Sequence, residues 1–200
     1  METKLILLFL AALNAAAADP HVLWSIGKPD HNNAELALAP SGYAQFDDDA
    51  YFVVGKSDAK RDWPYVQPGP EDGWAGGRTH TFTIVFGVDQ PGTNGACELV
   101  FDLMDTQSKA PPKLHIDVNG HPFERQMPAG AGDDSVNGNP SRGRSHHFEI
   151  EFPAGWLGRG NNKLTIAAVS GSWLLYDCLA LETPPGITGA PVIGPDALQI

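Results

Sequence analysis

The sequence predicts an all-β domain, a β-sandwich or jelly roll of antiparallel strands with little helix. Several short segments alternate between apolar and polar residues with a period of two, as strands do when one face is buried. Gly and Pro are frequent, at 22 and 17 of 200 residues. They cluster between the alternating segments, where Gly, Pro, Asn and Asp favour turns. In the sequence pattern, no amphipathic helix of useful length interrupts this arrangement.

The N-terminal segment, residues 1–18, has the pattern of a secretory signal peptide. Lys4 supplies a weak positive charge, an apolar stretch follows at 5–13, and Ala16–Ala18 fit the small residues that precede a cleavage site. The apolar stretch is too short to span a bilayer as a helix. We therefore expect a secreted or periplasmic protein with no membrane attachment after cleavage.

The domain itself is expected to span residues 19–183. Near its start, residues 31–40 can form one or two helical turns that Pro40 would end. Strand patterns then follow, each with its large apolar side chains on one face. They cover residues 80–88, 97–104, 113–118, 145–152, 163–169 and 173–182. Together with the shorter segments, these patterns predict roughly eight or nine strands, as a sandwich or jelly roll needs.

The C-terminal segment, residues 184–200, reads PPGITGAPVIGPDALQI and shows no alternation of polar and apolar residues. Such a Pro- and Gly-rich composition is typical of a linker. We expect this segment to be a linker or a truncated tail.

Charge and cysteine content narrow the partners and the chemistry. The formal net charge is −11 without a cluster of Lys and Arg in the sequence, which argues against a nucleic-acid partner. The two cysteines, Cys97 and Cys178, can form a disulfide in an oxidising compartment or remain as two buried thiols. The sequence leaves both alternatives open.

No sequence motif of a catalytic, metal or cofactor site is present. The sequence lacks a nucleophile elbow, a phosphate-binding loop and the histidine spacing of zinc proteases. His146 and His147 would point to opposite faces of a strand, so they cannot chelate one ion together. Asp47–Asp49 and the loop at 133–139 offer oxygen ligands of the kind Ca²⁺ prefers. We expect no cofactor, with calcium as an alternative to solvated acidic turns.

The segment at 61–80 contains the candidate binding residues. An exposed aromatic ring can stack on the apolar face of a sugar and leave the hydroxyl groups free for hydrogen bonds. The candidates for carbohydrate binding are Trp63, Tyr65, Trp74, Arg78 and His80. In the alternative, the rings hold a long loop in place by packing, because Trp is highly buried on average.

Four segments together resemble the C-terminal jelly-roll domain of rhamnogalacturonan lyases, the third domain of that polysaccharide lyase family. They are YFVVGKSDAKRDWPYVQPGP at 51–70, HTFTIVFGV at 80–88, KLHIDVNG at 113–120 and LGRGNNKLTIAAVSGSWLLYDCLALE at 157–182. The resemblance covers most of the chain after residue 22. It implies a galactose-binding-like fold similar to carbohydrate-binding modules. It implies no catalytic residue here, because the catalytic Lys and His of those lyases belong to a different domain.

The sequence therefore favours a secreted, non-catalytic carbohydrate-binding module for pectic or other plant cell-wall polysaccharide, accessory to a polysaccharide lyase in the same chain or operon. Arg61, Arg78 or Lys113 would meet uronate carboxylates. In one alternative the domain is part of a polysaccharide lyase or glycoside hydrolase whose active site lies elsewhere, or uses Lys113 and His115 on one strand face. In another, it is a structural spacer that binds no sugar.

Overall fold

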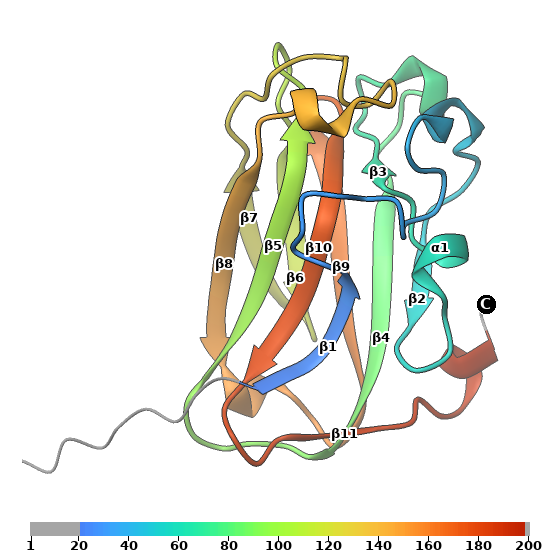
Figure 1. Cartoon of the computed structure of the whole chain (residues 1–200). Helices are drawn as coiled ribbons and strands as arrows, with labels where there is room; N and C mark the ends of the chain where they lie inside the picture. The colour runs from blue at the N-terminus through green and yellow to red at the C-terminus, as the bar shows by residue number, and fades with distance from the viewer. Residues whose placement is uncertain (1–20, 199–200) are drawn as a thin grey trace, which may run out of the picture.

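The computed structural model of the chain describes residues 21–198, and these residues form two β-sheets packed face to face (Figure 1). This arrangement confirms the predicted all-β sandwich. The signal-peptide prediction for residues 1–18 concerns a segment that lies outside the described residues. In the described range, no helix has the length and apolar character that crossing a membrane requires.

The first sheet has the strand order β1-β10-β5-β8, with the short β3 also paired to β10. All of its pairings are antiparallel. Its strands are β1 (His21–Gly27), β3 (Val66–Gln67), β5 (Ala96–Thr106), β8 (His146–Pro153) and β10 (Leu174–Thr183).

The second sheet has the order β11-β4-β9-β6-β7, and β2 pairs in parallel with β4. Its strands are β2 (Tyr51–Val53), β4 (Thr81–Gln90), β6 (Lys113–Val118), β7 (His121–Gln126), β9 (Gly160–Ser170) and β11 (Thr188–Ala190). The helical elements of the described chain are short and lie in the connections. They are α1 (Ala59–Asp62) and the 3₁₀ turns η1 (Gly42–Gln45), η2 (Gly73–Ala75), η3 (Pro140–Arg142), η4 (Ala154–Trp156) and η5 (Pro195–Leu198).

The alternating apolar residues of the strands fill the space between the two sheets. On β5, the side chains predicted to share a face are Cys97, Leu99, Phe101 and Leu103, and all four are buried in the main core. Burial of this continuous apolar surface provides the main driving force for the fold. The face assignment made from the period of two is therefore correct for this strand.

The C-terminal segment is not a linker in its described part, which corrects the expectation for residues 184–200. Strand β11 pairs with β4 along the edge of the second sheet. Ile187 is buried in the main core, and Val192 and Ala197 pack against Val53 and Val85. The physical reason is that β4 carries apolar side chains on both faces, so its outer face needs a cover. The C-terminal segment supplies that cover.

The segment at 31–40 forms no helix, although the sequence allowed one or two helical turns. The carboxylate of Asp177 instead accepts hydrogen bonds from the backbone N–H groups of His31 and Asn32, at 3.0 Å each. Further along, Ala37 forms a bridge with Pro64. These long-range partners hold the backbone in a non-helical course across the sheet.

The two cysteines are free thiols on different faces of the first sheet. Cys97 belongs to the core between the sheets, whereas Cys178 packs with Val100 and Ala180 on the outer face. Burial raises the pKa of Cys97 to about 11 and that of Cys178 to about 12. Of the two alternatives, the structure shows buried thiols, which are poor nucleophiles because the thiolate is disfavoured.

Candidate functional site

A groove of about 260 Å³ opens at the end of the sandwich where β5 ends and β10 begins. Loops from both sheets meet at this end (Figure 1). The groove draws its walls from five separate parts of the chain, so a rigid double sheet positions a site built almost entirely from loops. Its lining residues are Tyr43, Asp72, Trp74, Gln107, Asp133, Val136, Asn137, Ser172 and Trp173.

Asp72 organises the floor of the groove through three hydrogen bonds. One carboxylate oxygen accepts from Ser172 Oγ at 2.5 Å and from Trp74 Nε1 at 3.1 Å. The other accepts from the backbone N–H of Gly69 at 2.8 Å. Burial raises the pKa of the Asp72 carboxyl, although these hydrogen bonds oppose the rise. A buried carboxylate with this many donors fixes its neighbours in one arrangement.

The loop that carries Asp72 lies directly on the turn between β9 and β10. A Cβ atom at Gly69 would lie 2.4 Å from the carbonyl oxygen of Gly171 and 2.7 Å from that of Ser172. Such distances are far inside van der Waals contact, so only glycine allows the two backbones to approach this closely. This approach brings Ser172 within hydrogen-bonding distance of Asp72.

Trp74 presents a partly exposed aromatic ring at the groove. The ring of Tyr43 meets it edge-on, with centroids 5.1 Å apart and an interplanar angle of 79°. Phe46 makes a second edge contact at 6.3 Å. Because the indole nitrogen is also bonded to Asp72, the orientation of the ring is fixed before any ligand arrives. A pre-oriented ring loses little conformational entropy on binding.

The opposite wall of the groove is polar. Gln107 Nε2 donates to Asp133 Oδ1 at 3.3 Å, and Asn137 Nδ2 donates to the backbone oxygen of Asp133 at 2.7 Å. Asp133 and Asn137 are exposed, and Gln107 is half-buried. Their remaining oxygen and amide groups can accept and donate hydrogen bonds to hydroxyl groups.

Buried Asp105 holds this polar wall in place. Its Oδ1 accepts from the backbone N–H groups of Thr106 and Ala131, and its Oδ2 accepts from Ser135 Oγ at 2.6 Å. Below the wall, Tyr65 donates its hydroxyl to the backbone oxygen of Val136 at 2.7 Å. The loop at 128–143 is long, but these bonds tie it to the core.

Trp63 and Tyr65 do not contribute rings to the surface, which corrects the sequence-based assignment of both residues to carbohydrate binding. Both side chains have 0% exposure. Trp63 packs edge-on against Phe52, Phe82 and Tyr176 in the core. The physical reason is that the loop folds inward here to cap the core, where two large rings gain more from burial than from solvent exposure.

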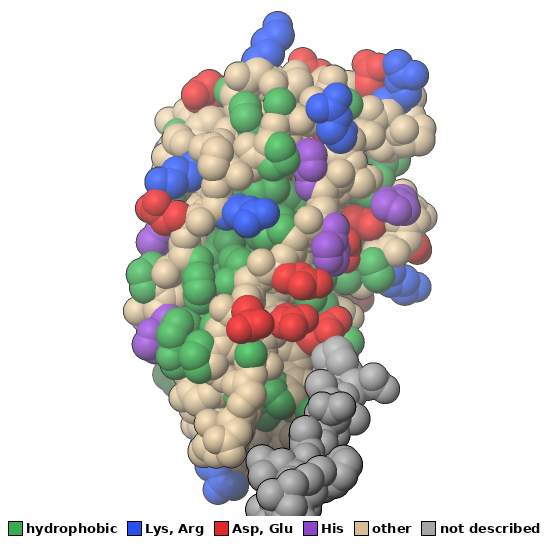
Figure 2. Space-filling view, turned by 90° about the vertical axis from the view of Figure 1, so that its left-hand side faces the viewer, with side chains coloured by type: hydrophobic (Ala, Val, Ile, Leu, Met, Phe, Trp, Pro, Cys, Tyr) green, Lys and Arg blue, Asp and Glu red, His purple; other side chains and the backbone are tan. Residues whose placement is uncertain are grey.

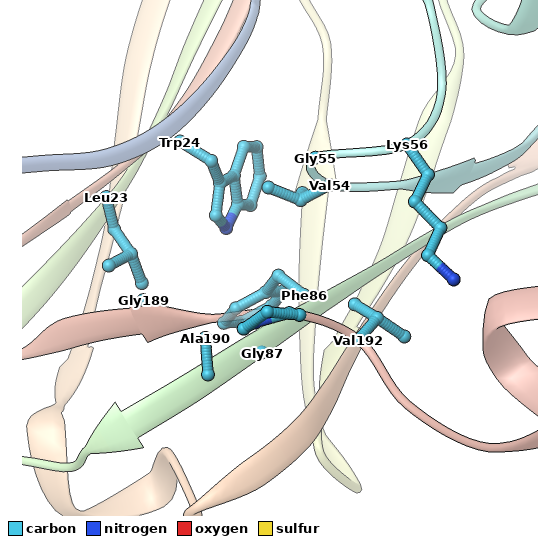
Figure 3. Close-up of a pocket in the computed structure, with 11 residues that line it drawn as sticks. Leu23, Trp24, Val54, Gly55, Lys56, Phe86, Gly87, Gly189, Ala190 and Val192 are labelled. Carbon is cyan, nitrogen blue, oxygen red and sulfur yellow. The ribbon is translucent and has the colours of Figure 1, made fainter.

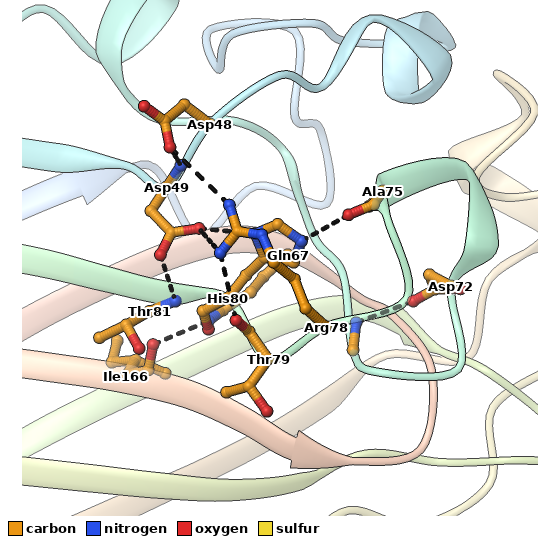
Figure 4. A network of polar contacts seen from close by, with 11 residues as sticks. Asp48, Asp49, Gln67, Asp72, Ala75, Arg78, Thr79, His80, Thr81 and Ile166 are labelled. Atoms are coloured by element: carbon orange, nitrogen blue, oxygen red, sulfur yellow. Dashed lines mark hydrogen bonds and ion pairs between the residues drawn. The ribbon is translucent and has the colours of Figure 1, made fainter.

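Arg78 and His80 form a polar network beside the groove, and neither lines it (Figure 4). His80 is buried, with Nδ1 at 2.5 Å from Asp49 Oδ1 and Nε2 at 2.8 Å from the oxygen of Ala75. Arg78 pairs with the same Asp49 oxygen at 3.3 Å. Asp49 Oδ2 also accepts from the backbone N–H of Thr81 at 3.0 Å. This network joins the loop to the start of β4, which is a structural role.

The acidic segments considered for calcium have other partners in the structure. Asp48 and Asp49 pair with Arg78, and Asp134 pairs with Arg142. Within residues 21–198, no group of three or more His, Cys, Asp or Glu side chains is arranged to hold a metal ion.

Of the five predicted site residues, Trp74 alone lies in the groove. Sequence reasoning missed Tyr43, Asp72, Gln107 and Ser172, and it considered Asn137 only as part of a loop that could bind calcium. One local signal existed for Asp72, because it lies two residues before Trp74 in a Gly- and Pro-rich loop. The others come from distant segments that only the fold brings together.

The outer face of the first sheet is acidic and differs in character from the groove. Glu98 on β5 pairs with Glu151 on β8 and with Glu182 on β10, and Glu149 lies nearby. Figure 2 shows acidic side chains gathered on this side of the molecule. Partial burial and the charges of these three neighbours raise the pKa of Glu98. These neighbouring carboxylates give the face a negative charge.

Comparison with known proteins agrees with the resemblance found in the sequence. The family described as "CBM-like: Polysaccharide lyase family 4, domain III" matches residues 22–181. A rhamnogalacturonate lyase of Dickeya dadantii (strain 3937) is 30% identical over 169 residues, which cover 80% of this chain and 28% of that protein. The chain therefore aligns with little more than a quarter of this relative.

Solved structures to which the chain is similar include two family 35 carbohydrate-binding modules. One, from an environmental isolate, has a TM-score of 0.42 at 12% identity and covers 85% of this chain and 99% of its own. The other, Xyl-CBM35 in complex with a disaccharide containing glucuronic acid, has a TM-score of 0.36 at 11% identity and covers 88% and 95%. Because the family match spans nearly the whole sandwich, the chain belongs to the carbohydrate-binding-module-like domain III family of polysaccharide lyase family 4.

Proposed function

We propose that this domain binds a carbohydrate in the groove and acts as a non-catalytic module of a polysaccharide lyase. The observation that carries the proposal is the pre-oriented ring of Trp74, which faces a groove with a polar wall. The ring offers an apolar surface for the C–H face of a sugar, and the wall offers hydrogen-bond partners for its hydroxyl groups. The volume of about 260 Å³ is near the lower limit for small-molecule pockets, which suits one sugar unit.

The groove favours a neutral sugar over a uronate. Its lining includes Asp72 and Asp133 but neither Lys nor Arg. The three cations considered for uronate binding each have a carboxylate partner in the domain. Arg61 pairs with Asp62, Arg78 with Asp49 and Lys113 with Glu124. A uronate in the groove would therefore meet negative charge without a free cation to offset it.

The polymer we infer is a pectic or other plant cell-wall polysaccharide, bound through its neutral sugar units. Support for this comes from the rhamnogalacturonate lyase to which the chain is similar. Export directed by residues 1–18 would bring the domain to such polymers outside the cytoplasm. Catalysis would then belong to another part of a longer protein or to a separate partner.

Affinity electrophoresis against a panel of polysaccharides tests the proposal. We expect retardation by a neutral polymer such as galactan or arabinan and little retardation by homogalacturonan. Trp74→Ala should weaken the binding roughly tenfold, since losing a stacked ring costs on the order of 1–2 kcal/mol. Trp156→Ala is the matched control, because this half-buried indole lies in η4 at the opposite end of the sandwich.

Two results would contradict the proposal. If the folded domain binds no polymer of the panel, the spacer alternative replaces it. If homogalacturonan binds more tightly than the neutral polymers, the charge argument fails even though carbohydrate binding survives. Asn137→Ala separates the contribution of the polar wall from that of the Trp74 ring. The substitution removes a hydrogen-bonding group of the wall and leaves the ring in place.

The lyase alternative within this sandwich has weaker support. Lys113 and His115 share the outer face of β6, as the period of two requires, but the Lys113 ammonium lies 2.5 Å from Glu124 Oε2. Neither residue lines the groove. Release of product with ultraviolet absorbance from an unsaturated uronate, catalysed by this chain alone, would restore that alternative.

A further inference from the structure

A second pocket, separate from the groove, lies at the side of the sandwich. It opens between β1, the edge strand of the first sheet, and β11, the edge strand of the second sheet, and the loop after β2 closes its third side (Figure 3). Its volume is about 320 Å³. The residues around it include Leu23, Trp24, Val54, Lys56, Phe86 and Val192.

The lining of this pocket excludes a sugar. Apart from the Trp24 indole N–H and the Lys56 ammonium, its side chains are aliphatic or aromatic, and no carboxylate, amide or hydroxyl side chain contributes. A polyhydroxylated ligand would lose its bonds to water here and find few replacements, which is costly. The pocket therefore suits a ligand whose body is apolar.

The indole N–H of Trp24 has no hydrogen-bond partner. The side chain is 5% exposed, and Nε1 is buried without an acceptor. Figure 3 shows this nitrogen on the edge of the ring that is turned toward Phe86 and Ala190. A buried donor without a partner is destabilising, so the environment of this N–H group is a sensitive reporter of what enters the pocket.

Lys56 supplies a positive charge at the rim. Its ammonium contacts the backbone oxygen of Ala197 at 3.3 Å, and it takes part in none of the ion pairs found in residues 21–198. The neighbouring carboxylate of Asp196 accepts instead from Asn161 Nδ2 at 3.0 Å. A free cation beside an apolar pocket attracts an anionic group, in contrast to the formal net charge of −11 of the whole chain.

We propose that this pocket binds a small aromatic carboxylate, with its ring against the apolar wall that includes Leu23, Trp24 and Val192 and its carboxylate at Lys56. The rings of Trp24 and Phe86 lie 5.6 Å apart at an interplanar angle of 52°. The two rings are therefore in contact with each other, and a ligand ring packs on the side of this pair that faces the pocket, not between the two rings. An apolar cavity of about 150 Å³ accepts benzene, so about 320 Å³ accommodates one ring with a short carboxylate side chain.

Titration of the chain with trans-cinnamate, followed by the indole N–H resonances in ¹⁵N NMR, tests the proposal. The Trp24 signal is identified by its loss in Trp24→Phe. We expect this signal to shift saturably, whereas the signal of Trp173, which lines the groove and not this pocket, stays in place. Absence of a saturable shift of the Trp24 signal would overturn the proposal.

Two variants separate the contributions of shape and charge. Val54→Trp fills the pocket, because Figure 3 shows the Val54 side chain directed toward Trp24, and it should abolish binding. Lys56→Gln should weaken cinnamate about two- to fivefold, as expected for a solvent-exposed ion pair, and leave neutral cinnamamide unchanged. Lys109→Gln is the matched control, because Lys109 is an exposed lysine that does not line the pocket.

The outcomes of these variants decide the proposal independently of whether Val54→Trp folds. If Lys56→Gln and the unchanged chain bind cinnamate equally, no carboxylate meets Lys56 and the proposal is wrong. If a folded Val54→Trp still binds cinnamate with unchanged affinity, the ligand occupies another place. Polysaccharide binding is not required for any of these measurements, so they do not depend on the function proposed for the groove.

Discussion

Trp63 and Trp74 belong to one loop, yet the fold uses them in opposite ways. Trp63 is fully buried among Phe52, Phe82 and Tyr176. Trp74 is partly exposed at the groove, with its nitrogen bonded to Asp72. The first half of the loop caps the core and the second half shapes the site. In an aromatic-rich loop on a β-scaffold, the role of each ring must therefore be assigned separately, because one loop can both cap the core and shape a binding site.

The buried half contributes to the site indirectly. The Tyr65 hydroxyl donates to the backbone of Val136, which lines the groove. Gln67 continues this support, because it donates to the backbone oxygens of His80 and Ile166 and accepts from the Tyr176 hydroxyl. The core thus positions the groove through a small set of buried hydrogen bonds.

The largest effect that separates the two halves is expected from Trp63→Ala. Removing a fully buried indole leaves a cavity that costs about 3–5 kcal/mol of unfolding free energy. Urea unfolding followed by fluorescence or circular dichroism measures this loss. Trp63→Phe is the control, since it keeps an aromatic ring and should lose clearly less. A Trp63→Ala variant with full stability and lost sugar binding would reverse the roles assigned here.

A smaller loss is expected from Gly69→Ala, which tests the contact between the loop and the turn before β10. The added Cβ would lie 2.4 Å from the oxygen of Gly171, so one backbone must move, at a cost of roughly 1–3 kcal/mol. Because the same contact places Ser172 against Asp72, carbohydrate binding should weaken as well. Thermal unfolding and affinity electrophoresis measure the two effects.

Gly73→Ala is the matched control for this substitution, because a Cβ at Gly73 would meet no atom within 4 Å. Equal stability losses in the two variants would show that loop flexibility, and not the close approach of the backbones, is responsible.

These predictions depend on features that the sequence reveals unequally. The faces of the strands follow from a local period of two, so the core residues of β5 were predictable from the sequence alone. The groove was not predictable, because Asp72 and Ser172 are 100 positions apart and no local pattern connects them. The packing of the C-terminal segment on β4 had one signal in the sequence. Val85 is apolar on the otherwise Thr-rich face of β4, so this face needs a cover.

A smaller loss of stability is expected from Trp74→Ala. The ring is partly exposed, so the variant loses its edge contacts with Tyr43 and Phe46 and one hydrogen bond to Asp72. The cost in unfolding free energy should be roughly 1–2 kcal/mol, well below that of Trp63→Ala. The domain should remain folded and lose sugar affinity. Unfolding of Trp74→Ala under conditions where Trp63→Ala stays folded would contradict the division of the loop.

The smallest expected effect concerns His146 and His147, two neighbours on β8 of which the first is half-buried and the second is exposed. Hydrogen bonds to Asp102 at 2.7 Å and to Glu149 at 3.2 Å raise the pKa of exposed His147 above 6.5. Burial lowers the pKa of His146 below the same value. Titration of both imidazole groups by NMR should therefore separate the two neighbours in opposite directions.

The two shifts have opposite consequences for stability. The folded pKa of His147 is raised, so its contribution is fully present below pH 6.5 and is lost as the pH rises through the folded pKa. The folded pKa of His146 is lowered, so its contribution is present above pH 6.5 and is lost as the pH falls through the folded pKa. Asp102→Asn should lower the pKa of His147 and leave that of His146 unchanged, because the two side chains point to opposite faces of the strand. If the pKa values of both histidines shift in Asp102→Asn, the two imidazoles share one environment. That result would contradict the assignment of neighbouring side chains to opposite faces of β8.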